Sequence, residues 1–282
     1  MQSVTWFVTG CHTGFGRALA LQLAQAPNVN LVATARRPQT QLKYLDRFNH
    51  GQIKKAQLDV TDHSQVKKAV QTAQQTFGRI DVLVNNAGIG YFGTFEESNW
   101  RIAHRMFDID FWGLCDVTRT VLPLMRKQRH GTIVNFSSTS GLKGFPALAY
   151  YNSVKHAVEG VTKTIAKEVQ PLGIKCLLVE PSDFRTDWGG RSSQKTNSKF
   201  PDDYRSAQQY MNDVEAHGST QAPGDPKLAA QIIYDQVTHH WQTLPLHLPL
   251  GVNATNGAAT EFEHELTEIK RMRKISVSAD DR

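Results

Sequence analysis

Short apolar runs and longer segments of helical periodicity alternate along the first 180 residues of the chain. The apolar runs cover residues 4–9, 28–37, 53–58, 80–84, 131–136 and 174–179. Helical periodicity covers residues from 17 onward, then 40–49, 64–77, 99–129 and 150–169. The apolar runs show no period of two, as expected of strands that helices cover on both faces. The pattern predicts an α/β fold with a doubly wound parallel sheet of the Rossmann type and helices on both faces.

The pattern changes after Ser182. Residues 183–223 are rich in Ser, Gln, Asn, Asp and Lys with few large aliphatic side chains, which predicts a mobile segment with one or two short helices rather than more sheet. Helical periodicity resumes at residues 226–240 and 258–274, and the apolar run 244–250 supplies a last strand that its prolines confine to a sheet edge. No repeat or linker divides the chain, so residues 1–282 are expected to form a single domain.

Composition and charge narrow the class of protein. With 282 residues, 40% of them hydrophobic and 21% charged, the chain has the composition of a soluble globular protein. The net charge is +6, but Lys and Arg are scattered, and the one dense basic cluster, at residues 270–274, is typical of a solvated helix face. We therefore expect no nucleic-acid partner.

The cysteines and the apolar segments indicate a location. Cys11, Cys115 and Cys176 are far apart and lack paired metal-ligand spacing, which argues against a disulfide framework or a zinc site and predicts no metal. The first ten residues do not have the pattern of a signal peptide, and no segment reaches the roughly 18 apolar residues of a membrane span. The expectation is a cytoplasmic protein with no membrane partner.

Tyr151 and Lys155 lie four residues apart in a segment with helical periodicity, so their side chains share one face of the helix. A phenol beside an ammonium is an acid poised to ionise, because nearby positive charge favours the phenolate. By itself, such a pair is more often a solvated surface feature. Ser138 follows the apolar run 131–136 and is placed at a strand end that faces the start of this helix.

A loop with three glycines, Gly10, Gly14 and Gly16, separates the first predicted strand from the first helix. Glycines let a backbone approach a pyrophosphate closely, and a helix N-terminus offers free amides and the positive end of its dipole. The alternative interpretation of the glycines is a tight turn, but the strand before and the helix after favour a nucleotide site.

Arg36 and Arg37 lie at the end of the second predicted strand, where an acidic residue would bind the ribose of NAD. Guanidinium groups at this point suit a 2′-phosphate, which favours NADP(H) over NAD(H) as cofactor. The alternative is that both arginines are solvated before Pro38.

Six motifs in a fixed order then identify the chain as similar to the short-chain dehydrogenase/reductase family over residues 4–190. They are TGCHTGFG at 9–16, DVT at 59–61, NNAG at 85–88, Ser138, YNSVK at 151–155 and EPSDFRT at 180–186. Within that family, ATARRP and FRTDW resemble the NADP-preferring carbonyl reductases and the hydroxysteroid or retinol dehydrogenase-like members.

This resemblance implies roles for individual residues. Tyr151 would be the general acid for carbonyl reduction or the base for alcohol oxidation, Lys155 would lower the pKa of Tyr151, and Ser138 would hold the substrate oxygen. The family spacing before the tyrosine selects Ser138 rather than Ser137. The implied cofactor-binding residues are Gly10, His12, Thr13, Gly14, Phe15, Gly16, Arg36, Arg37, Asp59, Val60, Asn86, Ala87, Gly88, Tyr151, Lys155, Pro181 and Thr186.

The sequence departs from the family pattern in three places. Asp110 stands where the family usually has an asparagine, Ser182 replaces a glycine, and Ser153 with Val154 replaces the common Ala-Ser. Asp110 is thus a candidate catalytic residue. In the family, this asparagine binds a water that relays protons. A charged Asp110 near Lys155 would weaken the effect of that lysine on Tyr151; alternatively, Asp110 binds the same water and the proton relay is unchanged.

Together these features predict an NADP-dependent oxidoreductase that acts on a small carbonyl or alcohol substrate. An apolar or aromatic substrate is favoured because Tyr91, Phe92, Phe145, Phe184 and Trp188 are placed near the nicotinamide, although core packing explains some of them equally well. The alternative function is an NADPH-binding regulatory or sensor protein with little turnover. By resemblance, residues 183–223 include a substrate lid, and helices 100–129 and 150–170 pair copies into a homodimer or homotetramer.

Overall fold

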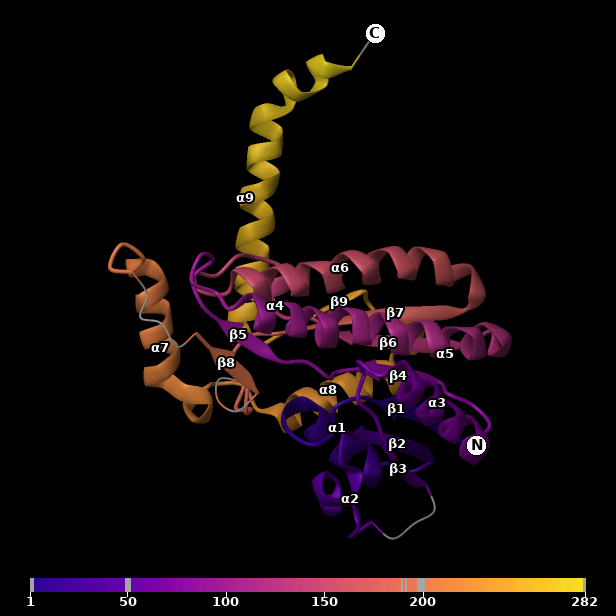
Figure 1. The fold of residues 1–282 in the computed structure, drawn as a ribbon. Helices are drawn as coiled ribbons and strands as arrows, with labels where there is room; N and C mark the ends of the chain where they lie inside the picture. The colour runs from indigo at the N-terminus through magenta and orange to yellow at the C-terminus, as the bar shows by residue number, and fades with distance from the viewer. Residues whose placement is uncertain (1–2, 49–51, 189, 191, 197–200, 281–282) are drawn as a thin grey trace.

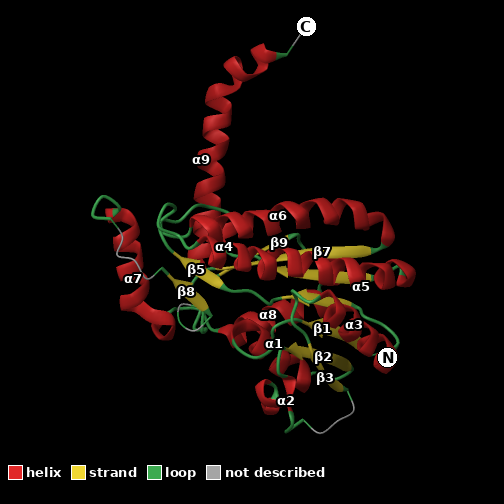
Figure 2. Cartoon of the chain, in the orientation of Figure 1, coloured by secondary structure: helices red, strands yellow, loops and turns green. Residues whose placement is uncertain are grey.

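The computed structural model describes residues 3–48, 52–188, 190, 192–196 and 201–280. Its centre is a parallel sheet in the order β3-β2-β1-β4-β6-β7-β9, with helices on both faces (Figures 1 and 2). The strands are β1 Val4–Val8, β2 Val29–Ala35, β3 Ile53–Gln57, β4 Val82–Asn85, β6 Gly131–Phe136, β7 Ile174–Pro181 and β9 His247–Leu250. This architecture confirms the predicted doubly wound sheet in a single domain.

Two layers of helices bury the sheet. The helices are α1 Gly14–Gln25, α2 Pro38–Gln41, α3 His63–Phe77, α4 Trp100–Phe107, α5 Leu114–Gln128, α6 Ala149–Val169, α7 Arg205–Gln221, α8 Pro226–His239 and α9 Val252–Ser276. Side chains of α1 and α8 pack on one face of the sheet, and those of α3, α5 and α6 pack on the other. In β1, Trp6 faces the first layer and Phe7 the second, and both are fully buried. Burial on both faces explains why the strands lack a period of two.

The ends of the helices follow local chemistry. Asp62 caps α3, because its Oδ1 accepts hydrogen bonds from the backbone N–H groups of Ser64 (2.9 Å) and Gln65 (3.1 Å). Gly78 ends the same helix in the left-handed region, with φ of 75°. β9 lies at the edge of the sheet, and among the described strands β7 is its one neighbour there. Pro249 has no N–H to donate, and an edge strand tolerates this because it has no second neighbour to bond. The edge position of this strand was predicted from its prolines.

Three elements differ from the predictions. The helix expected at 40–49 is one short turn, α2, followed by a 3₁₀ turn at Lys43–Leu45, and residue 49 lies outside the described residues. The helix expected at 99–129 is interrupted by a π-helical turn at Asp108–Gly113. The segment 183–223 was wrongly predicted to add no sheet: β8 Ser193–Lys195 pairs with β5 Gly90–Phe92, and α7 has 17 residues.

Residues 189, 191 and 197–200 of that segment lie outside the described residues. Its described part, α7 and β8, stands at one end of the sheet beside β5 (Figure 1). Within the described part of the chain, no helix combines the length and the apolar character needed to cross a membrane.

The strand order reverses direction at β1, whose neighbours are β2 on one side and β4 on the other. The chain leaves β1 toward one face of the sheet, through α1, and leaves β4 toward the other face, through α5. This divergence opens a crevice beyond the carboxyl ends of β1 and β4. The glycine loop, the end of β4 and the end of β6 meet at this crevice.

Candidate active site

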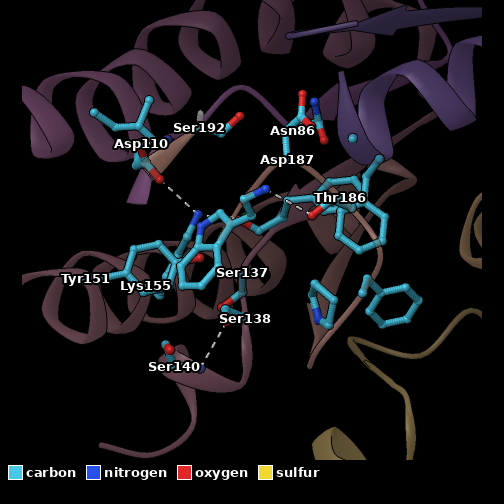
Figure 3. Close-up of a pocket in the computed structure, with 18 of the residues that line it drawn as sticks. Asn86, Asp110, Ser137, Ser138, Ser140, Tyr151, Lys155, Thr186, Asp187 and Ser192 are labelled. Carbon is cyan, nitrogen blue, oxygen red and sulfur yellow. Dashed lines mark hydrogen bonds and ion pairs between the residues drawn. The ribbon is translucent and has the colours of Figure 1, made fainter. Parts of the chain in front are cut away.

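A cleft of about 1060 Å³ opens at the carboxyl ends of β1, β4, β6 and β7. This volume is at the upper end of the range, roughly 300–1,000 Å³, that is typical of small-molecule and cofactor sites. Residues from each of the sequence motifs line it, and Figure 3 shows how the polar side chains from α6, the β6 end and the β7 end converge. The structure therefore brings together residues that are up to 247 positions apart in the chain, from Gly10 to Gly257.

The glycine loop forms the first wall of the cleft. A Cβ atom on Gly16 would lie 2.4 Å from both Asn86 Nδ2 and the backbone oxygen of Gly10. Asn86 Nδ2 donates hydrogen bonds to the backbone oxygens of Thr9 (2.9 Å) and Gly10 (3.1 Å), which fixes the loop against the end of β4. The close packing of the loop against Asn86 therefore requires glycine at position 16.

The N-terminus of α1 opens toward the same cleft. Thr13 occupies the cap position with extended backbone, but its side chain makes no capping hydrogen bond. His12, Thr13, Gly14 and Phe15 all line the cleft. Uncapped amides at a helix N-terminus, together with a backbone that glycine keeps accessible, fit the pyrophosphate of a dinucleotide.

The end of β2 and the loop after β3 form another part of the cleft wall. Arg36 is exposed and lines the cleft, together with Asp59 and Val60. Arg37 is also exposed, but it is the N-cap residue of α2, where its backbone N–H donates to Gln41 Oε1 (2.9 Å), and it lies outside the residues that line the cleft. Of the two arginines predicted to contact the cofactor, the structure places Arg36 on the cleft wall.

Tyr151, Lys155 and Ser138 meet at the centre of the cleft. Tyr151 is in the first turn of α6 and is 5% exposed, and Lys155, one turn further on, is 6% exposed. The Nζ of Lys155 lies 5.6 Å from the centre of the Tyr151 ring. Ser138 begins the 3₁₀ turn Thr139–Gly141, and its Oγ accepts a hydrogen bond from the backbone N–H of Ser140 (3.1 Å) (Figure 3).

Burial dominates the acidity of the tyrosine. It raises the pKa of the Tyr151 phenol above its ordinary value, the positive charge of Lys155 opposes this, and the negative charge of Asp110 adds to it. Ser138 and Trp188 lie close enough to the phenol to lower its pKa by smaller amounts. Ser137 also lines the cleft, but its Oγ is buried and makes no hydrogen bond to a described residue. The geometry thus couples Ser138 to the tyrosine.

The π-helical turn places Asp110 directly behind Lys155. Asp110 is 2% exposed, its Oδ1 accepts a hydrogen bond from the backbone N–H of Ile89 (2.9 Å), and its Oδ2 lies 3.1 Å from Lys155 Nζ. Burial raises the pKa of this carboxyl, while the charge of Lys155 opposes the rise. Burial alone would lower the pKa of Lys155, but the charges of Asp110 and Tyr151 outweigh it and raise that pKa.

Lys155 has a second fixed contact. Its Nζ donates a hydrogen bond to the backbone oxygen of Phe136 at the end of β6 (3.2 Å). An ammonium has three donors, so the hydrogen bond to Phe136 and the ion pair with Asp110 do not use all of its donor capacity.

The β7 end closes the cleft over the glycine loop. Pro181, Ser182 and Thr186 line it, and the Cβ of Thr186 lies 3.6 Å from the position that a Cβ on Gly14 would take. The side-chain oxygen of Thr186 accepts a hydrogen bond from the backbone N–H of Trp188 (3.3 Å). Ala87 and Gly88 line the opposite wall. The predicted cofactor residues of the glycine loop and of the β4 and β7 ends therefore face the same space, with one exception. Gly16 is packed behind the loop, against Asn86.

The aromatic residues expected around a substrate divide into two groups. Phe145, Phe184 and Trp188 line the cleft, and the Trp188 ring lies 5.0 Å from the Tyr151 ring. Tyr91 and Phe92 are 1% and 0% exposed and pack in a core cluster, so their prediction as cleft residues was wrong. The hydroxyl of Tyr91 accepts a hydrogen bond from the backbone N–H of Asn99 (2.5 Å), which fixes it away from the cleft.

The sequence interpretation missed residues of the cleft wall that come from α7 and α9. Tyr210 of α7 lines the cleft, its ring lies 5.8 Å from that of Phe145, and burial raises the pKa of its phenol. Asn253 and Asn256 of α9 also line it. The helical spacing of Ala207, Tyr210, Met211 and Val214 could have predicted α7, but no local signal shows which part of the molecule this helix covers.

Comparison with known proteins agrees with this arrangement. The sequence model of the family described as short chain dehydrogenase matches residues 5–197. The chain is 35% identical over 281 residues to the oxidoreductase calM of Penicillium decumbens, covering 96% of this chain and 91% of that protein. A short-chain dehydrogenase of Streptomyces avermitilis superposes with a TM-score of 0.89 at 32% identity, covering 99% of this chain and 100% of the other.

A structure of ElxO with NADP bound superposes with a TM-score of 0.71 at 28% identity, over 88% of this chain and 96% of ElxO. The family match covers more than half of the chain, and the relative from Penicillium decumbens is similar along almost its whole length. The doubly wound sheet and the cleft that the glycine loop, Tyr151 and Lys155 line agree with membership of this family. The chain therefore belongs to the short-chain dehydrogenase/reductase family.

Proposed function

We propose that this protein is an NADP-dependent oxidoreductase that reduces a carbonyl compound, or oxidises the corresponding alcohol, with Tyr151 as the general acid or base. The observation that carries the proposal is the convergence of Tyr151, Ser138 and Lys155 at the centre of a cleft whose far end is the glycine loop. Proton transfer by a positioned side chain and binding of the substrate oxygen are the two tasks that the protein itself must perform.

The cleft fits a nicotinamide dinucleotide. The uncapped N-terminus of α1 and the backbone around Gly10 and Gly14 would hold the pyrophosphate, and Asp59 and Val60 would lie at the adenine. Arg36 on the cleft wall favours a 2′-phosphate, and the related ElxO structure contains NADP. When bound, the nicotinamide supplies or accepts the hydride.

The residues at the centre of the cleft then handle the proton. The raised pKa of Tyr151 keeps the phenol protonated near neutral pH, and this is the form that donates a proton to a carbonyl oxygen. Ser138 is placed to hold that oxygen. Lys155 stabilises the phenolate that remains, because its positive charge opposes the effect of burial.

The walls of the substrate end favour an apolar or aromatic carbonyl compound. The Trp188 ring lies 5.0 Å from the Tyr151 ring, and Phe145 and Tyr210 line the same cleft with their rings 5.8 Å apart. Phe184 lines the cleft beside Phe15 of the glycine loop. Residues from α7 and from the segment before it provide part of this wall, as expected of a substrate lid. We propose that this segment contacts the substrate.

A sensor that binds NADPH with little turnover is the second candidate, and the buried Asp110–Lys155 ion pair is the observation that favours it. If Asp110 neutralises Lys155 completely, the lysine has little effect on Tyr151. The position of Lys155 argues for turnover. Its Nζ contacts Asp110 and the backbone oxygen of Phe136, yet it also lies 5.6 Å from the centre of the Tyr151 ring, where its charge still favours the phenolate.

The test is a comparison of the wild type and Tyr151→Phe with NADPH and a panel of ketones, aldehydes, quinones and steroids. We expect the wild type to reduce at least one of these compounds. The variant should lose turnover by roughly 10²-fold or more and keep its affinity for NADPH, measured by quenching of protein fluorescence. Wild-type binding of NADPH with no turnover on any compound would support the sensor, and a fully active variant would refute the role of Tyr151.

A further inference from the structure

The C-terminal helix α9 leaves the body of the protein. Its first turns pack on β9 and on the 3₁₀ turn Thr139–Gly141, where Ala254 and Ala258 are buried. Every residue from Phe262 to Ser276 is exposed, and Figure 1 shows this half of the helix projecting beyond α6. About four turns of helix thus stand without support from the described part of their own chain.

The projecting half carries an apolar stripe. The exposed fractions are 45% for Phe262, 49% for Leu266, 67% for Ile269 and 40% for Met272. Their spacing of four, three and three residues places them along one face of the helix. Such a stripe is the seam by which helices pair, whereas a helix that is solvated all round is polar all round. A helix segment of this length is marginally stable by itself, so a partner would stabilise it.

The charges beside the stripe are segregated along the helix. Glu261, Glu263, Glu265 and Glu268 precede Ile269, and Lys270, Arg271, Arg273 and Lys274 follow it. Among the described residues of α9, the ion pair within the helix is Glu268 with Arg271, at 3.3 Å. The acidic half and the basic half are therefore largely left to interact with something outside the helix.

We propose that α9 pairs in antiparallel orientation with α9 of a second copy of this chain, about a two-fold axis at Ile269. In this register Leu266 packs against the partner's Met272, and Glu265 lies opposite the partner's Arg273. The acidic half of each helix then faces the basic half of the other, and the two helix dipoles are opposed. A parallel pair would instead place glutamates against glutamates and arginines against arginines.

The same charges argue against an anionic lipid surface as the occupant. A helix that lies on such a surface carries basic residues along its whole polar face. The first half of the α9 stripe has glutamates on both flanks, and these would be repelled. The pairing also differs from the helix-pair interfaces that the family resemblance implied, because it uses the half of α9 that projects beyond α6 in Figure 1 rather than helices 100–129 and 150–170.

A charge-swap experiment on the full chain tests the pairing and its direction. Glu265→Arg and Arg273→Glu should each reduce the molar mass measured by light scattering at low micromolar concentration to about half of the wild-type value, because each places like charges opposite each other. The double variant Glu265→Arg with Arg273→Glu should restore the wild-type mass. Wild-type mass in both single variants would overturn the proposal, as would no recovery in the double variant.

A cysteine cross-link tests whether the two-fold axis lies at Ile269. Its result does not depend on whether the protein also pairs through other surfaces. In a Cys115→Ser background, which removes the partly exposed native thiol, Ile269→Cys should form a disulfide-linked dimer under mild oxidation. The matched control is Thr267→Cys on the opposite face of the helix, and it should not. Equal cross-linking of both would overturn the pairing. Co-sedimentation of a monomeric wild type with phosphatidylglycerol vesicles would assign the stripe to lipid instead.

Discussion

The Nζ of Lys155 lies 3.1 Å from a carboxylate oxygen of Asp110, and both side chains are almost completely buried. An asparagine at this position would leave Lys155 as the single charge behind Tyr151. The carboxylate instead raises the pKa of both Lys155 and Tyr151. The ion pair therefore keeps the lysine charged in a buried position while it makes the phenol a weaker acid.

Asp110→Asn should shift the pH profile of alcohol oxidation toward lower pH. In the mechanism proposed above Tyr151 is the base in this direction, so the rate should rise with pH as the phenol loses its proton. Removal of the negative charge lowers the pKa of Tyr151, because that charge opposes the phenolate. The measurement is kcat for oxidation by NADP⁺ between pH 6 and about pH 10, with the alcohol of the best carbonyl substrate.

The matched control is Asp108→Asn, in the same π-helical turn. Asp108 is exposed, so the same change of charge there is screened by solvent and should leave the profile in place. An unchanged profile for Asp110→Asn would mean that the carboxylate only replaces the amide as a hydrogen-bond acceptor.

Much of this arrangement could be predicted from the sequence because it is local. Tyr151 and Lys155 are one helical turn apart, and Gly10 to Gly16 span a single strand–helix junction, so periodicity and turn chemistry suffice to place them. The covered sheet could be predicted for the same reason, since both faces of each strand had to be apolar.

The rest depends on tertiary packing. Nothing in the residues around Asp110 indicates a π-helical turn, and this turn is what buries the carboxylate against Lys155. Tyr91 and Phe92 have the composition of a substrate wall, but β5 pairs with β8 and turns them into the core. Tyr210 reaches the cleft because α7 folds back over it, a contact between segments more than 50 residues apart.

Arg36→Gln should raise the Michaelis constant for NADPH by about tenfold and leave that for NADH nearly unchanged. A hydrogen bond to a charged group contributes about 1.5–3 kcal/mol, and the exposed position of Arg36 puts the expected effect at the low end of that range. Steady-state kinetics with the two coenzymes measure the ratio. Arg37→Gln is the control, since Arg37 lies outside the cleft lining and should have the smaller effect. Equal effects of Arg36→Gln on both coenzymes would contradict the assignment of NADP.

Gly16→Ala should weaken NADPH binding and destabilise the fold by about 1–3 kcal/mol, because the added methyl group would overlap the backbone oxygen of Gly10 and the amide of Asn86. Fluorescence titration with NADPH and urea unfolding measure the two effects. Gly160→Ala is the control: it lies inside α6 with open space around it, and it should stabilise the protein by about 0.5–1 kcal/mol. Normal NADPH affinity in Gly16→Ala would show that the loop is not the phosphate site.

A second buried ionic group lies on the same face of α6, one turn beyond Lys155. Glu159 and Glu180 are 3% and 0% exposed, and Glu180 Oε1 lies 2.5 Å from Nδ1 of His247 on β9. The hydrogen bond that His247 donates to Glu180 is the main reason that the pKa of His247 is raised, and burial is the main reason that the pKa of Glu180 is raised. The folded protein thus holds more protons here than the unfolded chain does.

His247→Gln should therefore make the protein less stable at low pH than at high pH, relative to the wild type. A raised pKa means that the contribution of His247 is complete below its unfolded pKa of about 6.5 and is lost as pH rises through the higher folded value. The loss at pH 6 should be on the order of 1 kcal/mol or less, because the His247 side chain is 39% exposed and solvent screens the pair. Urea unfolding at pH 6 and at pH 9 gives the two differences, and His264→Gln, an exposed histidine on α9, should show none at either pH. An equal loss for His247→Gln at both pH values would mean that the imidazole contributes through packing rather than through its charge.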